Sequence, residues 1–169
     1  MQTPEGIAKA IESLYTSKYN TYLTQVEANW TASDPITLYD FEEIRVTVQP
    51  ENIVFFTAFP SLGIAVGNLV EVPEGDIQIQ RAARYYAMDV RLVYYLRGID
   101  DRELAKIVLR HIEASQLFFT DNPRMGLGNF TSVDNIRFEP SANVFESGGN
   151  SLVKGLRIRF DLMFMQGSL

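Results

Sequence analysis

Two stretches of the sequence alternate between large apolar residues and other residues for longer than an ordinary β-strand. The apolar positions are Tyr86, Met88, Val90, Leu92, Tyr94 and Leu96 in the first stretch, and Leu156, Ile158, Phe160, Leu162 and Phe164 in the second. A period of two puts these side chains on one face of a strand, so both stretches predict strands with one face on a core. At about 3.3 Å per residue the first strand would span roughly 33 Å. We expect the two apolar faces to form one side of the core.

Two other segments show the three- and four-residue spacing of an amphipathic helix. Thr3 and Pro4 have the character of an N-cap and a first helical residue, and the apolar residues behind them predict a helix over about residues 4–28. Asp100 and the glutamate three residues later have the spacing of a capping box. They predict a second helix that ends near Phe119.

The order of these elements predicts the fold class. A helix, several strands, a helix and several more strands favour antiparallel pairing with the helices on one face. We therefore predict an α+β fold, a mostly antiparallel sheet with long strands flanked by an N-terminal helix and a central helix. The chain would form a single domain over residues 1–169, with an extended β-hairpin arm around residues 60–85. Turns are expected at residues 73–76 and 148–150.

The segments between these elements carry weaker signals. Ile36–Val48 fits either a short helix or an extended connector that leads into a strand, and the apolar run Ile53–Thr57 predicts a buried strand. Leu62–Val72 is rich in valine and isoleucine but contains two glycines, which suggests bulges or an edge strand. A strand is also expected around Val133–Phe138, followed by an extended piece near Val144.

Composition narrows the classes of protein to which the chain could belong. With 46% hydrophobic and 12% aromatic residues among 169, it can bury a large core. The formal net charge is −6, and acidic chains grip nucleic acid poorly, because duplex binding neutralises phosphates with lysine and arginine. The sequence has no cysteine, as is typical of proteins made in a reducing cytoplasm. It has no signal-peptide pattern at its start and no apolar run of about 20 residues, so we expect no membrane association.

The residues that most often carry chemistry do not form recognisable motifs. The single histidine, His111, lies at the margin of an apolar helix face without metal-ligand spacing around it, so we expect a structural histidine at the edge of the core. Gly126 and Gly128 precede a strand rather than opening a helix, which disfavours a phosphate-binding loop. The Asp100–Asp101 pair is explained by the helix start. We therefore predict no catalytic residues, no metal site and no cofactor, and a protein that is not an enzyme.

The non-core faces of the two long strands carry an unusual set of side chains. Arginine, tyrosine and methionine gather there, at Arg91, Tyr95, Arg97, Arg157, Arg159 and Met163. Three interpretations are open: a solvated sheet face, a subunit interface in which such residues are enriched, or a nucleic-acid platform. The acidic balance of the chain disfavours the third. We take these six residues as the candidate subunit interface.

Several segments follow one another in an order that resembles that of a known protein family. They are the N-terminal helix, the run Ile53–Phe56, the strand Met88–Tyr95, the helix opening Gly98–Leu104 and the terminal strand Lys154–Leu162. In this order they resemble the tail terminator, or tail completion, proteins of long-tailed bacteriophages. In that family a strand, a short acidic turn, a helix and a glycine-led terminal strand recur. The resemblance covers most of the chain, although residues 36–49 and 60–79 have no clear counterpart.

The resemblance implies a structural virion protein. Such a protein would form a ring, usually a homohexamer, that caps the tail tube, stops its polymerisation and docks the head connector. Its partners would be copies of itself, the tail tube protein and the head connector or stopper protein, while genomic DNA would pass through the lumen without specific binding. It would be assembled in the host cytoplasm and reside in the phage neck. Two alternatives stay open: a head-completion or stopper protein of the same neck, and a small-ligand-binding or enzymatic α+β domain.

Overall fold

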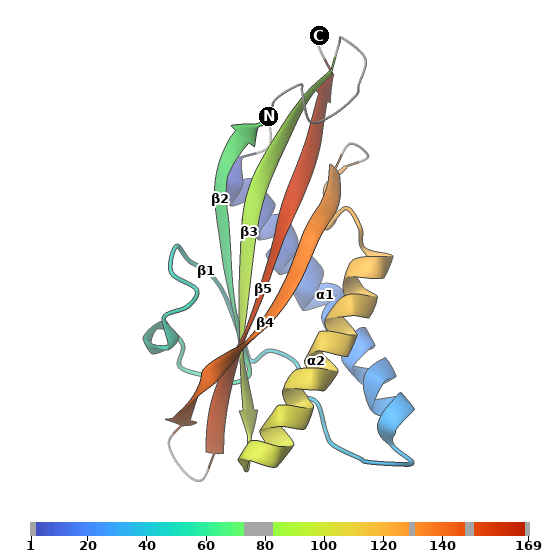
Figure 1. Ribbon diagram of the computed structural model, residues 1–169, viewed down its shortest axis with the longest axis vertical. Helices are drawn as coiled ribbons and strands as arrows, with labels where there is room; N and C mark the ends of the chain where they lie inside the picture. Colours follow the sequence, from blue (N-terminus) through green and yellow to red (C-terminus); the bar gives the residue numbers. More distant parts are fainter. Residues whose placement is uncertain (1–2, 73–82, 129–130, 148–150, 168–169) are drawn as a thin grey trace.

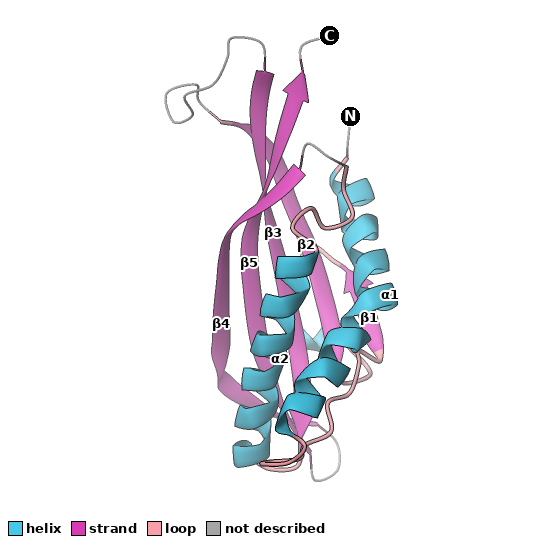
Figure 2. Cartoon of the chain, turned by 90° about the vertical axis from the view of Figure 1, so that its right-hand side faces the viewer, coloured by secondary structure: helices cyan, strands magenta, loops and turns pink. Residues whose placement is uncertain are grey.

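The fold is a single sheet with two helices packed on one of its faces (Figure 1, Figure 2). The computed structural model describes residues 3–72, 83–128, 131–147 and 151–167. Helices α1 (Pro4–Trp30) and α2 (Asp101–Asp121) cover the sheet, whose strands are β1 (Glu43–Val46), β2 (Ser61–Glu71), β3 (Ala83–Gly98), β4 (Thr131–Ser147) and β5 (Ser151–Gly167). The strand order is β1-β2-β3-β5-β4, and of the described pairs β1–β2 alone is parallel. The predicted α+β fold is confirmed.

The two long alternating stretches form adjacent antiparallel strands. β3 has 16 residues and β5 has 17, and they pair in continuous register, with Leu92 opposite Ile158 and Val90 opposite Phe160. These inward side chains are at most 1% exposed, because the helices lie on them. The upper ends of both strands extend beyond the helices (Figure 2). The prediction that the two apolar faces form one side of the core is confirmed.

Both helices begin where the capping signals predicted. The Gly6 N–H donates to the Thr3 hydroxyl at 3.1 Å, and the Glu103 N–H donates to the Asp100 carboxylate at 2.8 Å. In the second cap the Glu103 carboxylate accepts from the N–H of Ile99 at 2.6 Å, rather than from the Asp100 N–H of the ideal capping box. Each helix ends two residues later than predicted.

The predicted strand at Ile53–Thr57 is wrong. Ile53–Phe55 forms one turn of 3-10 helix, in which the Asn52 side chain accepts from the N–H of Val54 at 3.2 Å. This local cap competes with strand pairing, and it leaves Val54 81% exposed while Phe56 turns inward and is buried. The apolar run therefore covers part of the sheet instead of joining it.

The remaining segments follow one of the predicted alternatives. Residues 35–41 form an extended connector, not a helix, and lead to β1. β2 has the predicted bulge, between Val66 and Leu69, but only its upper part lies at an edge, because β1 pairs with Ser61–Ile64. The predicted strand near 133–138 and the piece near Val144 belong to one irregular strand, β4. The turns predicted at 73–76 and 148–150, and the middle of the predicted arm, lie outside the described residues.

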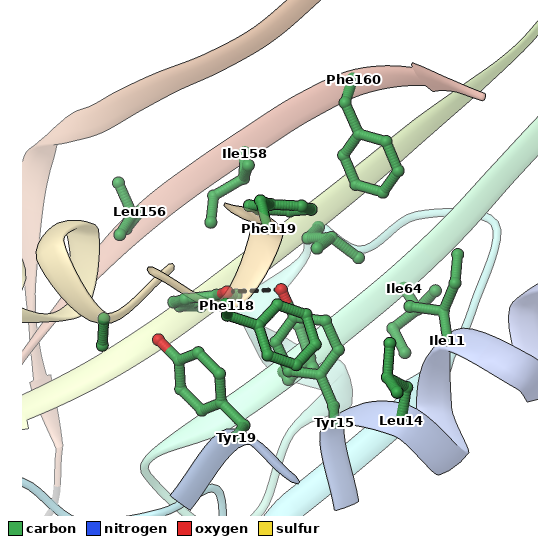
Figure 3. Close-up of a cluster of buried hydrophobic side chains, with 14 of the residues drawn as sticks. Ile11, Leu14, Tyr15, Tyr19, Ile64, Phe118, Phe119, Leu156, Ile158 and Phe160 are labelled. Carbon is green, nitrogen blue, oxygen red and sulfur yellow. Dashed lines mark hydrogen bonds between the residues drawn. The ribbon is translucent and has the colours of Figure 1, made fainter. Parts of the chain in front are cut away.

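The core between helices and sheet is unusually aromatic. Tyr15 and Tyr19 of α1 point toward Phe118 of α2, and Ile158 and Phe160 of β5 close the cluster from the sheet (Figure 3). All five side chains are at most 1% exposed. Burial of this apolar area stabilises the fold by roughly 25 cal/mol for each Å² removed from water.

Candidate interaction surface

The face of the sheet opposite the helices is partly covered by the chain itself. Residues 49–59, named here the cover segment, lie on the lower outer face of β2 and β3. Phe56 packs on Tyr95 with ring centroids 5.1 Å apart, and the Tyr95 hydroxyl donates to the carbonyl of Pro50 at 3.0 Å. Burial, with the nearby Glu51 charge, raises the pKa of Tyr95 to about 12. The cover segment thus closes a second, smaller apolar cluster on the outer face.

Gly63 of β2 is what allows the cover segment to lie so close. A Cβ atom at this position would lie 2.9 Å from the Pro50 Cβ and 2.9 Å from the Phe56 ring. We expect Gly63→Ala to lower the free energy of unfolding by about 1–3 kcal/mol, because overpacking forces the segment away from the sheet. Urea unfolding measures this loss, and limited proteolysis within residues 49–59 should become faster. Gly128→Ala is the control, since a Cβ there meets nothing within 4 Å, and a loss equal to that of Gly63→Ala would contradict the close approach.

All six residues of the candidate subunit interface lie on this outer face, but their surroundings differ. The set divides into Arg91, Tyr95 and Arg97 on β3 and Arg157, Arg159 and Met163 on β5. Tyr95 is only 3% exposed under the cover segment, so it is not accessible to another subunit in this arrangement. The other five are exposed or half-buried, and their role in subunit contact stays a prediction.

Three of the four arginines in this set have an acidic partner among the residues that the structure describes. Arg91 lies 3.1 Å from the carboxylate of Glu51 and 3.8 Å from that of Asp89. Arg157 lies 3.5 Å from Glu139, and Arg97 lies 3.9 Å from the exposed Glu42. Exposed pairs of this kind contribute about 0–1 kcal/mol each, so they orient the side chains more than they stabilise the fold.

Strand register brings together charged residues that sequence reasoning did not connect. Asp89, Asp161 and Asp134 stand opposite one another across β3, β5 and β4. Arg91, Arg159 and Arg137 do the same two residues further along β3 and β5 and three residues along the irregular β4. We name these sets the aspartate row and the arginine row. Like charges directly opposite on neighbouring strands are unfavourable. The Nε atom of Arg159, in the middle of its row, is buried with no hydrogen-bond partner among the described residues.

A second polar cluster lies inside the core, around His111. The Tyr19 hydroxyl is 3.2 Å from His111 Nδ1 and 3.0 Å from the Ser115 hydroxyl, which is also 3.0 Å from the Tyr94 hydroxyl. Tyr94 in turn lies 2.8 Å from the Tyr15 hydroxyl. Every one of these side chains is 0% exposed, so the prediction of a structural histidine at the core edge is wrong in position: His111 lies at the centre. Burial lowers the pKa of His111 to about 3 and raises the pKa of the three tyrosines.

The described residues contain no group of three or more His, Asp or Glu side chains placed to hold a metal ion. A partly open pocket of about 360 Å³ lies beside the cover segment and is bordered by Tyr95, Glu139 and Arg157.

Neither described helix has both the length and the apolar composition needed to cross a membrane. No protein-family model matches the sequence, and no curated protein matches it either.

Proposed function

We propose that the protein is a structural component of a phage neck, a tail terminator that forms a ring on the end of the tail tube. The observation that carries the proposal is the order of β3, the acidic capped start of α2 and the glycine-containing terminal strand β5. These are the segments through which the sequence resembles that family.

A ring of this kind would stop polymerisation by geometry. Tube growth repeats a head-to-tail contact, and a ring whose two faces differ occupies the growing end without offering the same contact again. A net charge of −6 is compatible with DNA passing through the lumen, because an acidic protein does not trap phosphates. A hexamer is the expected stoichiometry from the resemblance.

The test is the length and the end structure of tubes assembled with and without the protein. We expect purified protein to bind one end of polymerising tail tube protein and to shorten the tubes, as seen by negative-stain microscopy. Mass photometry of the protein mixed with tube protein should detect an oligomer of the mass of the ring. A protein that stays monomeric and never associates with tube ends or other neck components would refute the proposal.

A head-completion or stopper protein of the same neck is the second candidate. A pull-down against portal-complex proteins and tube protein separates the two, since a stopper would bind the former without capping the latter. The remaining alternative, a small-ligand or enzymatic domain, requires buried titratable groups that face a pocket. Among the described residues, pockets of about 400 and 360 Å³ are lined by neither His111 nor the core tyrosines Tyr15, Tyr19 and Tyr94. The buried Tyr95 borders the smaller pocket, but its hydroxyl donates to the Pro50 carbonyl.

A further inference from the structure

The arginine row and the aspartate row form two parallel stripes of opposite charge on the outer face of the sheet. Each row crosses three neighbouring strands, β3, β5 and β4, at right angles to their direction. Neighbouring strands lie about 4.8 Å apart, so each stripe is roughly 10 Å long, and the two stripes are two residues, or about 7 Å, apart. The register of three strands, not any local sequence signal, produces this arrangement.

The arginine row is only partly neutralised within one chain, whereas Asp161 of the aspartate row accepts a hydrogen bond from Asn135 Nδ2 at 2.9 Å. Of the three arginines, Arg91 alone has a carboxylate within 4 Å among the described residues, namely Glu51 at 3.1 Å and Asp89 at 3.8 Å. Arg159 stands between two other arginines, and its Nε atom is buried without a hydrogen-bond partner in the described part of the chain. Like charges opposite one another destabilise an isolated sheet. Opposite charges on a second molecule would reduce this repulsion.

We infer that this face binds a second copy of the same chain through a two-fold axis. If the axis lies between the two facing sheets, parallel to the stripes and midway between them, it carries each arginine row onto the partner's aspartate row. Each strand then faces its own copy, so Arg159 meets Asp161 of the other chain and Asp161 meets its Arg159. A stripe pattern of this kind is self-complementary, which is the requirement for an isologous interface.

The raised and uncovered parts of the outer face are also complementary under this two-fold axis. The cover segment stands above the sheet on the arginine side and exposes Val54 (81%) and Phe55 (42%). On the aspartate side the next outer row is uncovered and apolar, with Val70 and Ala87 opposite one another, and Val70 is 61% exposed. The two-fold operation lays the raised apolar segment of one chain over the uncovered apolar row of the other. Charge and apolar surface are therefore complementary under one axis.

Other occupants of the face fit less well. Nucleic acid would be attracted by the arginine row but repelled by the aspartate row beside it.

The two-fold pair is independent of the proposed ring, because a closed ring joins two unlike surfaces of each subunit and the pair joins one surface to itself. Either contact can hold without the other.

Charge reversal of one residue in each row gives a sharp test. In Arg159→Asp the two central positions are both acidic, and in Asp161→Arg they are both basic, so each variant repels its own copy. In a mixture of the two variants, every central acid of one chain faces a central base of the other. Sedimentation equilibrium at about 20 mM and about 500 mM salt measures the association constant, since interactions between exposed charges are screened at the higher value. Lys9→Glu, on the helical side at the exposed Lys9–Glu5 pair, is the control for the change in net charge made by Arg159→Asp.

We expect wild-type protein and Lys9→Glu to dimerise at low salt and to dissociate as salt is added. Each single reversal should weaken self-association at least about tenfold, and an equimolar mixture of the two should regain it, because each reversal turns two charge pairs across the interface from attraction to repulsion. Circular dichroism checks that the variants are folded; if one is not, Arg137→Asp and Asp134→Arg on β4 repeat the test at the sheet edge. A wild-type chain that is monomeric at low salt, or a mixture no stronger than its components, would overturn the inference. These outcomes do not depend on tube-end binding, so they are separate from the test of the ring.

Discussion

Replacement of Phe118 by alanine is expected to lower the free energy of unfolding by about 3–5 kcal/mol. Phe118 is 0% exposed at the centre of the aromatic cluster, where its ring centroid lies 4.5 Å from that of Tyr15 and 5.5 Å from that of Tyr22. It also meets Tyr19 edge-on at 5.6 Å. The loss combines the transfer free energy of the ring with the cavity that it leaves, because helices and sheet hold the cavity walls apart (Figure 3).

Chemical denaturation followed by circular dichroism measures this change. The control is Leu109→Ala on the same helix, where the side chain is 64% exposed, so the expected change is below about 0.5 kcal/mol. Phe118→Leu should fall between the two, since it removes part of the ring without emptying the site. A cost for Phe118→Ala near that of Leu109→Ala would mean that the aromatic cluster is not the packed centre of the fold.

The elements that sequence reasoning predicted correctly are those with local signals. The alternation in β3 and β5 depends on successive residues, and the caps at Thr3 and Asp100 depend on residues three positions apart. A wrong prediction came where two local signals competed. At Ile53–Phe55 the apolar residues favoured a strand, but the side chain of Asn52 caps a turn there instead.

The candidate surface was only partly predictable, because it depends on strand register. Sequence alternation correctly placed Arg91 and Arg159 on the outer face, but it could not show that they are opposite one another or that Arg137 completes their row. Nor could it show that Tyr95 is covered by residues more than 35 positions earlier in the chain, such as Pro50 and Phe56. The irregularity of β4 between Asp134 and Arg137 shifts its pairing with β5, and no local sequence pattern predicts such a shift.

His111 shows the same limit for the core. Helical spacing placed it beside an apolar stripe, and the structure packs Tyr19, Tyr94 and Phe41 around it from three different elements, with ring centroids 6.0 to 6.1 Å away. Its Nε2 atom is buried with no hydrogen-bond partner among the described residues. A neutral imidazole tolerates that site, whereas an imidazolium there would be a buried charge without a compensating partner. The protonation of this one side chain is therefore coupled to folding.

Stability should fall as the pH is lowered below about 6.5. The pKa of His111 is lowered by burial from its ordinary 6.5 to about 3 in the folded protein, so between these values the unfolded chain binds a proton that the folded chain does not. The free energy of unfolding that the neutral, buried His111 contributes is fully present above pH 6.5 and is lost as the pH falls toward 3. At about 1.4 kcal/mol for each pH unit, the loss reaches about 2–3 kcal/mol two units below the ordinary pKa.

Carboxylates also titrate in this range, so the comparison that isolates His111 is with His111→Phe, which keeps an aromatic ring in the site but cannot gain a proton. The hydrogen bond from Lys106 lowers the pKa of Asp34, which adds to the loss at low pH, while burial raises the pKa of Asp40, which opposes it. Both contributions are the same in the two proteins and cancel in the difference. Urea unfolding from pH 8 to 4.5 should show the wild-type free energy of unfolding falling by about 2–3 kcal/mol relative to that of the variant. Parallel curves for the two proteins would mean that His111 is protonated equally in the folded and unfolded chains, and that the buried cluster opens to water.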